Sequence, residues 1–187
     1  NAPNASAPST ATAPVSAPPV ANDRAAISVD DVGRLGLRNF AGEWSLAIWS
    51  LASDGRKLEG SGAAVGMMEG DNAIRIVITQ FESEEFPDAT GGGRVTISHL
   101  PGRGFTLKSD LGYSDEVLKL TGGYEADSNR YIFYLVGGAG GKIATGVDRI
   151  SVRLEIRSLD RNLWEAATFA HIDGKSTQVQ SSRFVRR

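Results

Sequence analysis

From Trp44 to the end of the chain, apolar residues alternate with polar or small ones in short runs separated by turn signals. The clearest run, residues 150–157, places isoleucine, valine and leucine on one face and serine, arginine and glutamate on the other. A period of two is typical of a β-strand with one face in an apolar core and the other in water. The pattern predicts about ten short strands, at residues 44–49, 58–66, 74–79, 95–99, 104–109, 116–121, 130–136, 150–157, 162–171 and 176–186.

The spacing of these strands favours one all-β architecture. Turn signals such as Asp54-Gly55, Asp127-Ser128-Asn129 and Asp173-Gly174 join consecutive runs, as in hairpins. A sandwich is the alternative, but a barrel leaves no exposed sheet edge. We therefore expect an antiparallel up-and-down barrel of about 8–10 strands.

One short helix is expected before the first strand. Val29, Val32, Leu35 and Phe40 recur at roughly helical spacing, and Ser28 is a suitable N-cap. Two glycines within this segment weaken a helix, so it should be short.

The N-terminal segment differs in composition from the rest of the chain. Residues 1–26 are rich in alanine and hold five of the seven prolines, namely Pro3, Pro8, Pro14, Pro18 and Pro19. Such a segment lacks the apolar surface needed to offset its ordering entropy, and its prolines favour extended conformations. We expect an extended Pro/Ala-rich arm at 1–26 and a barrel domain at 27–187.

Composition excludes several classes of site. The chain has no cysteine, which rules out disulfides, thiolate zinc sites and cysteine nucleophiles within it. A net charge of -2 argues against nucleic-acid binding. No apolar run approaches the roughly 20 residues that cross a bilayer, so we predict no transmembrane segment.

Two short motifs carry a resemblance to a known superfamily. The first strand opens with Gly42-Glu43-Trp44, which resembles the Gly-x-Trp opening of calycins, the superfamily of lipocalins, fatty-acid-binding proteins and nitrobindins. In calycins an arginine near the chain end packs across this tryptophan, and Arg183 or Arg186 matches it. Residues 122–131 resemble the Gly-Tyr-Asp hairpin of a bacterial lipocalin-like domain family of unknown function. The resemblance implies a calycin-like barrel closed by Gly42, Trp44 and one of these arginines.

Candidate chemistry is sparse. His171 is the best candidate for a ligand or acid–base role, although a hydrogen-bonded histidine at the barrel rim is the favoured interpretation. His99 precedes a Leu-Pro-Gly turn and is expected at the surface. The glycine-rich segments 136–142 and 174–176 lack the residues of a phosphate-binding loop and read as hairpin loops. No serine lies in a Gly-x-Ser-x-Gly motif. We predict no enzyme activity, metal or cofactor.

The leading functional hypothesis is a non-catalytic accessory subunit. The proline arm and the barrel loops would dock on other protein subunits of a membrane-associated assembly, of respiratory, photosynthetic or envelope type. The chain begins with Asn1, and a similar tether often follows a cleaved export signal or a lipid-modified residue. We therefore expect a periplasmic or otherwise extracytoplasmic protein, with a lipid anchor ahead of Asn1 as one form of attachment.

The alternative hypothesis is a carrier of a small apolar ligand inside the barrel. Barrels of this size can enclose one small ligand. Candidate lining residues are Trp44, Trp49, Phe105, Tyr131, Phe133, Trp164 and His171. Haem or metal binding through His171 is a third and more remote option.

Overall fold

The computed structural model describes residues 28–84, 92–110, 117–135, 151–172 and 175–187. One α-helix, α1, and a 3-10 helix, η1, precede the strands. The elements are α1 (Val29–Gly36), η1 (Leu37–Phe40), β1 (Gly42–Leu51), β2 (Lys57–Glu69), β3 (Ala73–Ser83), β4 (Arg94–Leu100), β5 (Gly104–Asp110), β6 (Leu118–Glu125), β7 (Arg130–Leu135), β8 (Ser151–Asp160), β9 (Leu163–Ile172) and β10 (Lys175–Arg186).

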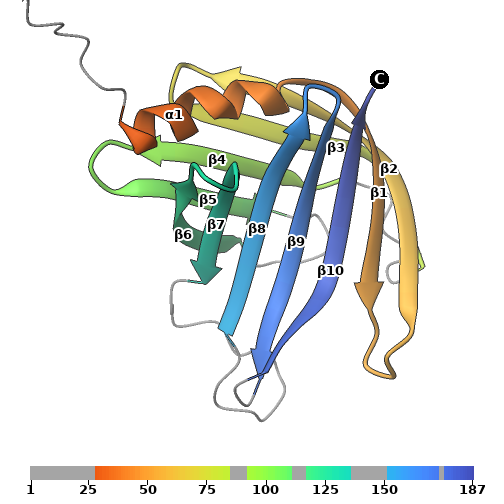
Figure 1. Cartoon of the computed structure of the whole chain (residues 1–187). Coiled ribbons are helices and arrows are strands. Elements are labelled where there is room, and N and C mark those ends of the chain that lie inside the picture. The colour runs from red at the N-terminus through yellow and green to blue at the C-terminus, as the bar shows by residue number, and fades with distance from the viewer. Residues whose placement is uncertain (1–27, 85–91, 111–116, 136–150, 173–174) are drawn as a thin grey trace, which may run out of the picture.

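These ten strands form one closed barrel (Figure 1). Each strand pairs antiparallel with the next one in sequence, and β10 returns to pair with β1. Trp44 lies opposite Arg186 in that closing ladder and opposite Ala64 in the ladder to β2. The predicted all-β up-and-down barrel with a short N-terminal helix is therefore confirmed.

Side chains alternate between the interior and the outside along each strand, as the period of two requires. In β1, Trp44 and Leu46 are buried, whereas Ser45 and Ala47 are exposed. A register shift in the β2–β3 ladder inserts one extra residue, Thr79, into β3. The extra residue reverses the alternation beyond it, as a β-bulge does.

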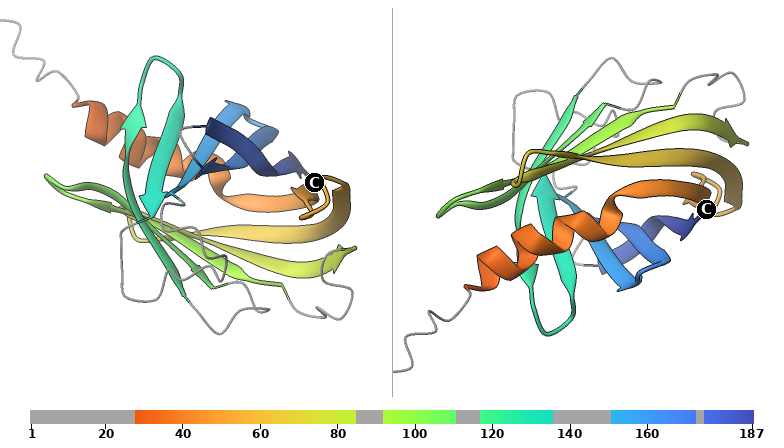
Figure 2. Two further views of the ribbon diagram at one scale, coloured as in Figure 1. Left: turned by 90° about the horizontal axis from the view of Figure 1, so that it is seen from below. Right: turned by 90° about the horizontal axis from the view of Figure 1, so that it is seen from above.

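Helix α1 lies across one end of the barrel (Figures 1 and 2). Its N-cap is Ser28, whose side chain accepts a hydrogen bond from the backbone N–H of Asp31 at 3.1 Å. Gly33 is the buried residue of the helix and faces the side chains of Tyr124 and Phe105. The Tyr131 hydroxyl donates a hydrogen bond to the Gly33 carbonyl, and burial raises the pKa of Tyr131, so this donor stays protonated.

The apolar stripe of α1 faces away from the barrel. Val29, Val32 and Leu35 are 53%, 40% and 42% exposed, whereas Phe40, which lies beyond the helix, is fully buried. The reason is steric, because the glycine backbone of the helix fits against Tyr124 and Tyr131 where larger side chains do not. Helical spacing in the sequence thus identified the helix, while its glycines determine which side meets the barrel.

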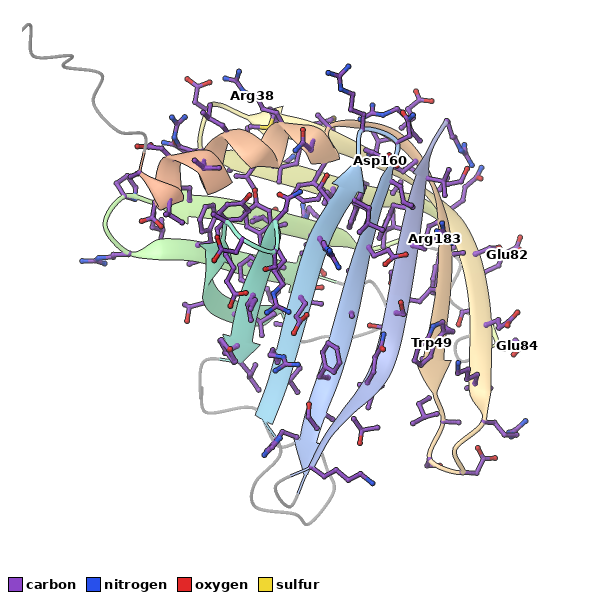
Figure 3. All side chains as sticks on the ribbon, in the orientation of Figure 1. Arg38, Trp49, Glu82, Glu84, Asp160 and Arg183 are labelled. Carbon is purple, nitrogen blue, oxygen red and sulfur yellow. The ribbon has the colours of Figure 1, made fainter. Side chains whose placement is uncertain are left out.

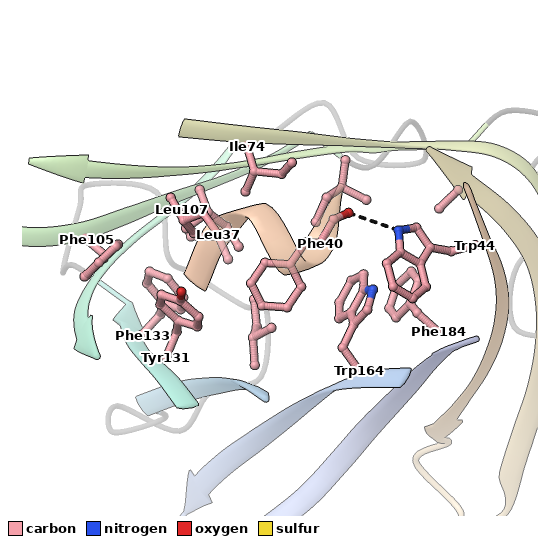
Figure 4. Packing of buried hydrophobic residues seen from close by; sticks show 14 of the residues in the cluster. Leu37, Phe40, Trp44, Ile74, Phe105, Leu107, Tyr131, Phe133, Trp164 and Phe184 are labelled. Carbon is pink, nitrogen blue, oxygen red and sulfur yellow. Dashed lines mark hydrogen bonds between the residues drawn. The ribbon is translucent and has the colours of Figure 1, made fainter. Parts of the chain in front are cut away.

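The same end of the barrel is closed by an aromatic cluster (Figure 4). The Trp44 indole N–H donates to the Phe40 carbonyl at 3.0 Å, and the Arg186 guanidinium lies 4.4 Å from the centroid of the Trp44 ring. Gly42 makes room for this arginine: its φ is +121°, and a Cβ there would lie 2.5 Å from an Arg186 nitrogen. Arg183 instead faces outward on β10 and pairs with Glu165 at 3.8 Å (Figure 3).

Replacing Gly33 by alanine tests the contact between α1 and the barrel. Alanine has the higher helix propensity, by about 1 kcal/mol. Its Cβ would, however, lie 2.7 Å from Tyr124 and 2.9 Å from Phe105. We expect Gly33→Ala to lower the unfolding free energy by about 1 to 2 kcal/mol, and Tm by about 3 to 6 °C in a thermal melt. Gly123→Ala is the control, since a Cβ there meets nothing within 4 Å. A rise in Tm for Gly33→Ala would contradict close packing of the helix.

Replacing the two C-terminal arginines separately tests the closure of the barrel. Arg186 also donates from Nε to the Arg161 carbonyl at 2.8 Å, so Arg186→Ala removes a cation–π contact and a hydrogen bond. We expect a loss of about 1 to 2 kcal/mol by urea denaturation. Arg183→Ala removes an exposed ion pair and should change stability by less than about 0.5 kcal/mol. Equal losses for the two variants would show that Trp44 does not depend on Arg186.

Candidate ligand-binding site

The interior of the barrel contains a cavity of about 160 Å³ that is lined mostly by aliphatic and aromatic side chains. Its described walls come from strands and from Gly93, which directly precedes β4, and helix α1 contributes none of them. The lining residues are Leu46, Ile48, Ile76, Ile78, Phe81, Gly93, Val95, Leu107, Ser109, Leu118, Leu120, Leu154, Ile156, Trp164, Ala166, Thr168, Gln180, Ser182 and Phe184.

Two glycines of β2 lie opposite wall residues of β1. Gly60 and Gly62 of β2 pair with Ile48 and Leu46 of β1, so β2 offers no side chain opposite these two wall residues. A Cβ on Gly62 would lie 2.2 Å from the Gln80 carbonyl oxygen, which shows how closely β2 and β3 approach here. The absence of a side chain at these glycines is what allows β2 and β3 to approach this closely.

Two aromatic side chains stand at the boundary between the cavity and the packed end of the barrel. Trp164 and Phe184 are stacked with ring centroids 3.5 Å apart and planes at 4°, and both line the cavity. Behind them, Trp164 contacts Phe40 and Trp44 edge to face (Figure 4). The Trp164 Nε1–H is buried and has no hydrogen-bond acceptor among the residues that the structure describes.

Besides the indole of Trp164, four polar side chains belong to the described lining; all four are uncharged, and three of them lie on one wall. Thr168 of β9 lies opposite Gln180 of β10, and its hydroxyl donates to Gln180 Oε1 at 3.3 Å. Ser182 follows on β10, and Ser109 belongs to β5 on another part of the wall. The described part of the lining contains no charged side chain.

The sequence analysis predicted seven ligand-binding residues, and the structure places them in different parts of the barrel. Trp164 lines the cavity. Four others are fully buried in the packed aromatic end and do not line it: Trp44, Phe105, Tyr131 and Phe133. Aromatic content alone therefore did not distinguish residues that fill the barrel from residues that surround a space.

The remaining two lie away from the cavity. Trp49 occupies the outer face of β1, where the Lys57 ammonium lies 4.5 Å from its ring centroid (Figure 3). Trp49 faces outward because side chains alternate along β1 and its neighbours Ile48 and Ser50 face inward. His171 is exposed near the end of β9 and is not part of the lining.

His99 corrects a second expectation from the sequence. It is only 7% exposed, although its position before a turn suggested the surface. Its ring lies 5.0 Å from that of Phe105, and neither ring nitrogen has a hydrogen-bond partner in the described part of the chain. The alternation that buries Ile97 extends to His99, so strand parity was the better guide than proximity to the turn.

Other predictions fall outside the described residues. These are the role of Pro3, Pro8, Pro14, Pro18 and Pro19 in the arm, and the loop at 137–141. Within the described ranges, no three histidine, aspartate or glutamate side chains gather as a metal site. No helix in those ranges has the length and apolarity to cross a bilayer.

The functional residues that sequence reasoning missed are mainly aliphatic or small. Ile48, Ile76 and Ala166 line the cavity, and their inward parity was readable from the alternating runs. The inward position of Phe81 was harder to predict from the sequence. The bulge at Thr79 turns Phe81 inward, although its spacing from Ile74, Ile76 and Ile78 would place it on the outer face.

Comparison with known proteins bears on the fold. No protein-family model and no curated protein matches the chain. Among solved structures, it is similar to the S-type phycobiliprotein lyase CPES from Guillardia theta, with 12% identity, a TM-score of 0.53, and coverage of 86% of this chain and 98% of that one. It is also similar to Rv2717c from M. tuberculosis, with 11% identity, a TM-score of 0.55, and coverage of 83% and 97%. With the closed ten-strand topology, these similarities show that the chain shares the β-barrel fold of these two structures.

Proposed function

We propose that the protein is a carrier that binds one small, predominantly apolar molecule inside its barrel. The observation that supports this most directly is the cavity of about 160 Å³ between the packed aromatic end and the inner walls of the strands. Apolar cavities of about 150 Å³ in proteins stay dry and take up molecules such as benzene. A ligand with a single ring or a short branched chain fits this space.

The lining supports binding in preference to catalysis. Its described polar groups are two serine hydroxyls, a threonine hydroxyl, a glutamine amide and an indole N–H. None of these is a general acid or base near neutral pH, and no carboxylate or histidine accompanies them in the described lining. One structural neighbour is named a lyase, so the fold itself is compatible with an enzyme. Our proposal for this chain is a carrier without a chemical step.

Filling the cavity from inside provides the test. Ala166 lines the cavity, and its neighbour Ala167 has the opposite parity and faces outward on the same strand. Ala166→Phe should place a phenyl group in the ligand space, whereas Ala167→Phe makes the same change outside the barrel. With acetophenone as the probe, we expect the first variant to weaken binding at least about tenfold and the second to leave it within about twofold.

Binding can be followed through the tryptophan indole N–H signals in ¹H–¹⁵N NMR spectra. The chain has three tryptophans. Trp164 lines the cavity, and Trp49 on the outer face serves as an internal reference. Undiminished acetophenone binding by a folded Ala166→Phe variant would show that the ligand does not occupy the cavity.

An accessory role is the second candidate, and the exposed stripe of α1 favours it. Val29, Val32 and Leu35 form an apolar row on the helix that directly follows residues 1–27. Such a row fits an apolar groove in a protein partner, in the manner of a helix bound along its i, i+3 positions. The arm and this stripe would then dock the barrel on a subunit of an extracytoplasmic, membrane-associated assembly.

The stripe can be tested in the full-length chain. Because all three residues are exposed, the triple variant Val29→Ser, Val32→Ser, Leu35→Ser should fold normally yet lose co-sedimentation with native membranes. Arg38→Ser, on an exposed residue that pairs with Asp71, is the control and should remain bound. Retention of the triple variant on the membranes at the wild-type level would rule out docking through the stripe.

A further inference from the structure

We infer that the ligand of the cavity is an uncharged molecule with a hydrogen-bond acceptor, and that the side-chain amide N–H of Gln180 donates a hydrogen bond to this acceptor. The inference rests on the proposed function, since it requires that the cavity be the binding site. It adds the chemical class of the ligand and a residue that determines specificity.

The charge of the lining excludes an ionised ligand from the described part of the cavity. Charged residues of the strands alternate with lining residues and face outward: Arg153 precedes Leu154, Glu165 follows Trp164, and Arg183 follows Ser182. No guanidinium or ammonium group among the described lining residues is available to a carboxylate. Burying an unpaired ion in such surroundings is strongly unfavourable.

The hydrogen bonding of Gln180 determines which partner it can take. Its Oε1 already accepts from the Thr168 hydroxyl at 3.3 Å. Its Nε2 carries two N–H donors, and no described residue accepts from them. A neutral acceptor on the ligand, such as a carbonyl or an ether oxygen, satisfies one of these donors, whereas a purely hydrocarbon ligand leaves the amide unpaired.

A bulge in β10 sets this glutamine apart from its neighbour. The β9–β10 register shifts between Gln178 and Gln180, so Val179 is the extra residue. Gln180 lies opposite the lining residue Thr168, while Gln178 lies opposite Phe169 on the outer face. Gln178 Nε2 also donates to the Gln180 carbonyl at 3.4 Å and bridges the bulge. Bulges commonly redirect a side chain at a binding site, which is the arrangement here.

The rest of the ligand is expected to be apolar. Trp164 and Phe184 offer a stacked aromatic pair on the same two strands, β9 and β10. Isoleucine, leucine and valine side chains supply most of the remaining wall. A small neutral ketone, ester or ether with a ring or branched chain combines these features.

Three probes of nearly the same shape separate acceptor from charge: acetophenone has a carbonyl, α-methylstyrene replaces that oxygen by a methylene group, and benzoate carries a carboxylate. We expect the wild type to bind benzoate at least about a hundredfold more weakly than acetophenone. In Gln180→Leu, the affinity for acetophenone relative to α-methylstyrene should fall about tenfold. Gln80→Leu is the matched control on the exposed outer face of β3, and it should leave this ratio unchanged.

An infrared measurement on the wild type does not depend on the folding of any variant. The carbonyl band of bound ¹³C-labelled acetophenone should lie at lower wavenumber than in hexane, because the Gln180 N–H donates to it. A band at the hexane position, or an unchanged affinity ratio in a folded Gln180→Leu variant, overturns the role of Gln180. Benzoate binding as tight as that of acetophenone overturns the uncharged class.

Failure of the proposed function looks different. In that case neither acetophenone nor α-methylstyrene shifts the Trp164 signal of the wild type. Binding of both neutral probes with no dependence on Gln180 overturns only the further inference and leaves the carrier function standing.

Discussion

The indole of Trp44 joins the segments that close one end of the barrel. Its N–H holds the Phe40 carbonyl at the end of η1, its ring packs edge to face on Trp164, and the Arg186 guanidinium covers it from the last strand. Gly42 is required because Arg186 occupies the space of a side chain at that position. Strand β1 also pairs with both β2 and β10. The contacts of Trp44 therefore link the helical segment, the first strand and the ladder that closes the barrel.

Closure at this end determines where the barrel is filled and where it is hollow. Large inward side chains fill this end and pack at aromatic contact distances, Phe105 against Tyr131 and Trp44 against Trp164. Farther along the same strands, the inward positions carry smaller or aliphatic residues such as Ile48, Ala166 and Ser182. The cavity thus follows from a difference in side-chain volume along the barrel, and its uncharged lining follows from strand parity. Recognition of a small ligand is the chemistry that such an interior can perform.

Most of the fold could be predicted from local patterns, because the two faces of an antiparallel strand appear in the sequence as alternating apolar and polar residues. The ten strands, the helix after Ser28 and the Gly42–Trp44 opening were all predicted in this way. Parity would also have placed His99 inside and Trp49 outside, but the turn near His99 and the aromatic character of Trp49 were given more weight. The inward position of Phe81 depends on a bulge, and the outward stripe of α1 depends on two glycines that fit against tyrosines. These features arise from tertiary contacts, which no window of sequence contains.

The central claim, a predominantly apolar cavity that receives a ligand, can be tested by diffraction from crystals of the protein under xenon pressure. Xenon enters apolar cavities without needing hydrogen bonds or charge. The account predicts xenon density inside the barrel, in contact with Leu46, Ile76 and Trp164. Density for a hydrogen-bonded water cluster in that space, or side chains that fill it and leave no room for xenon, would contradict it.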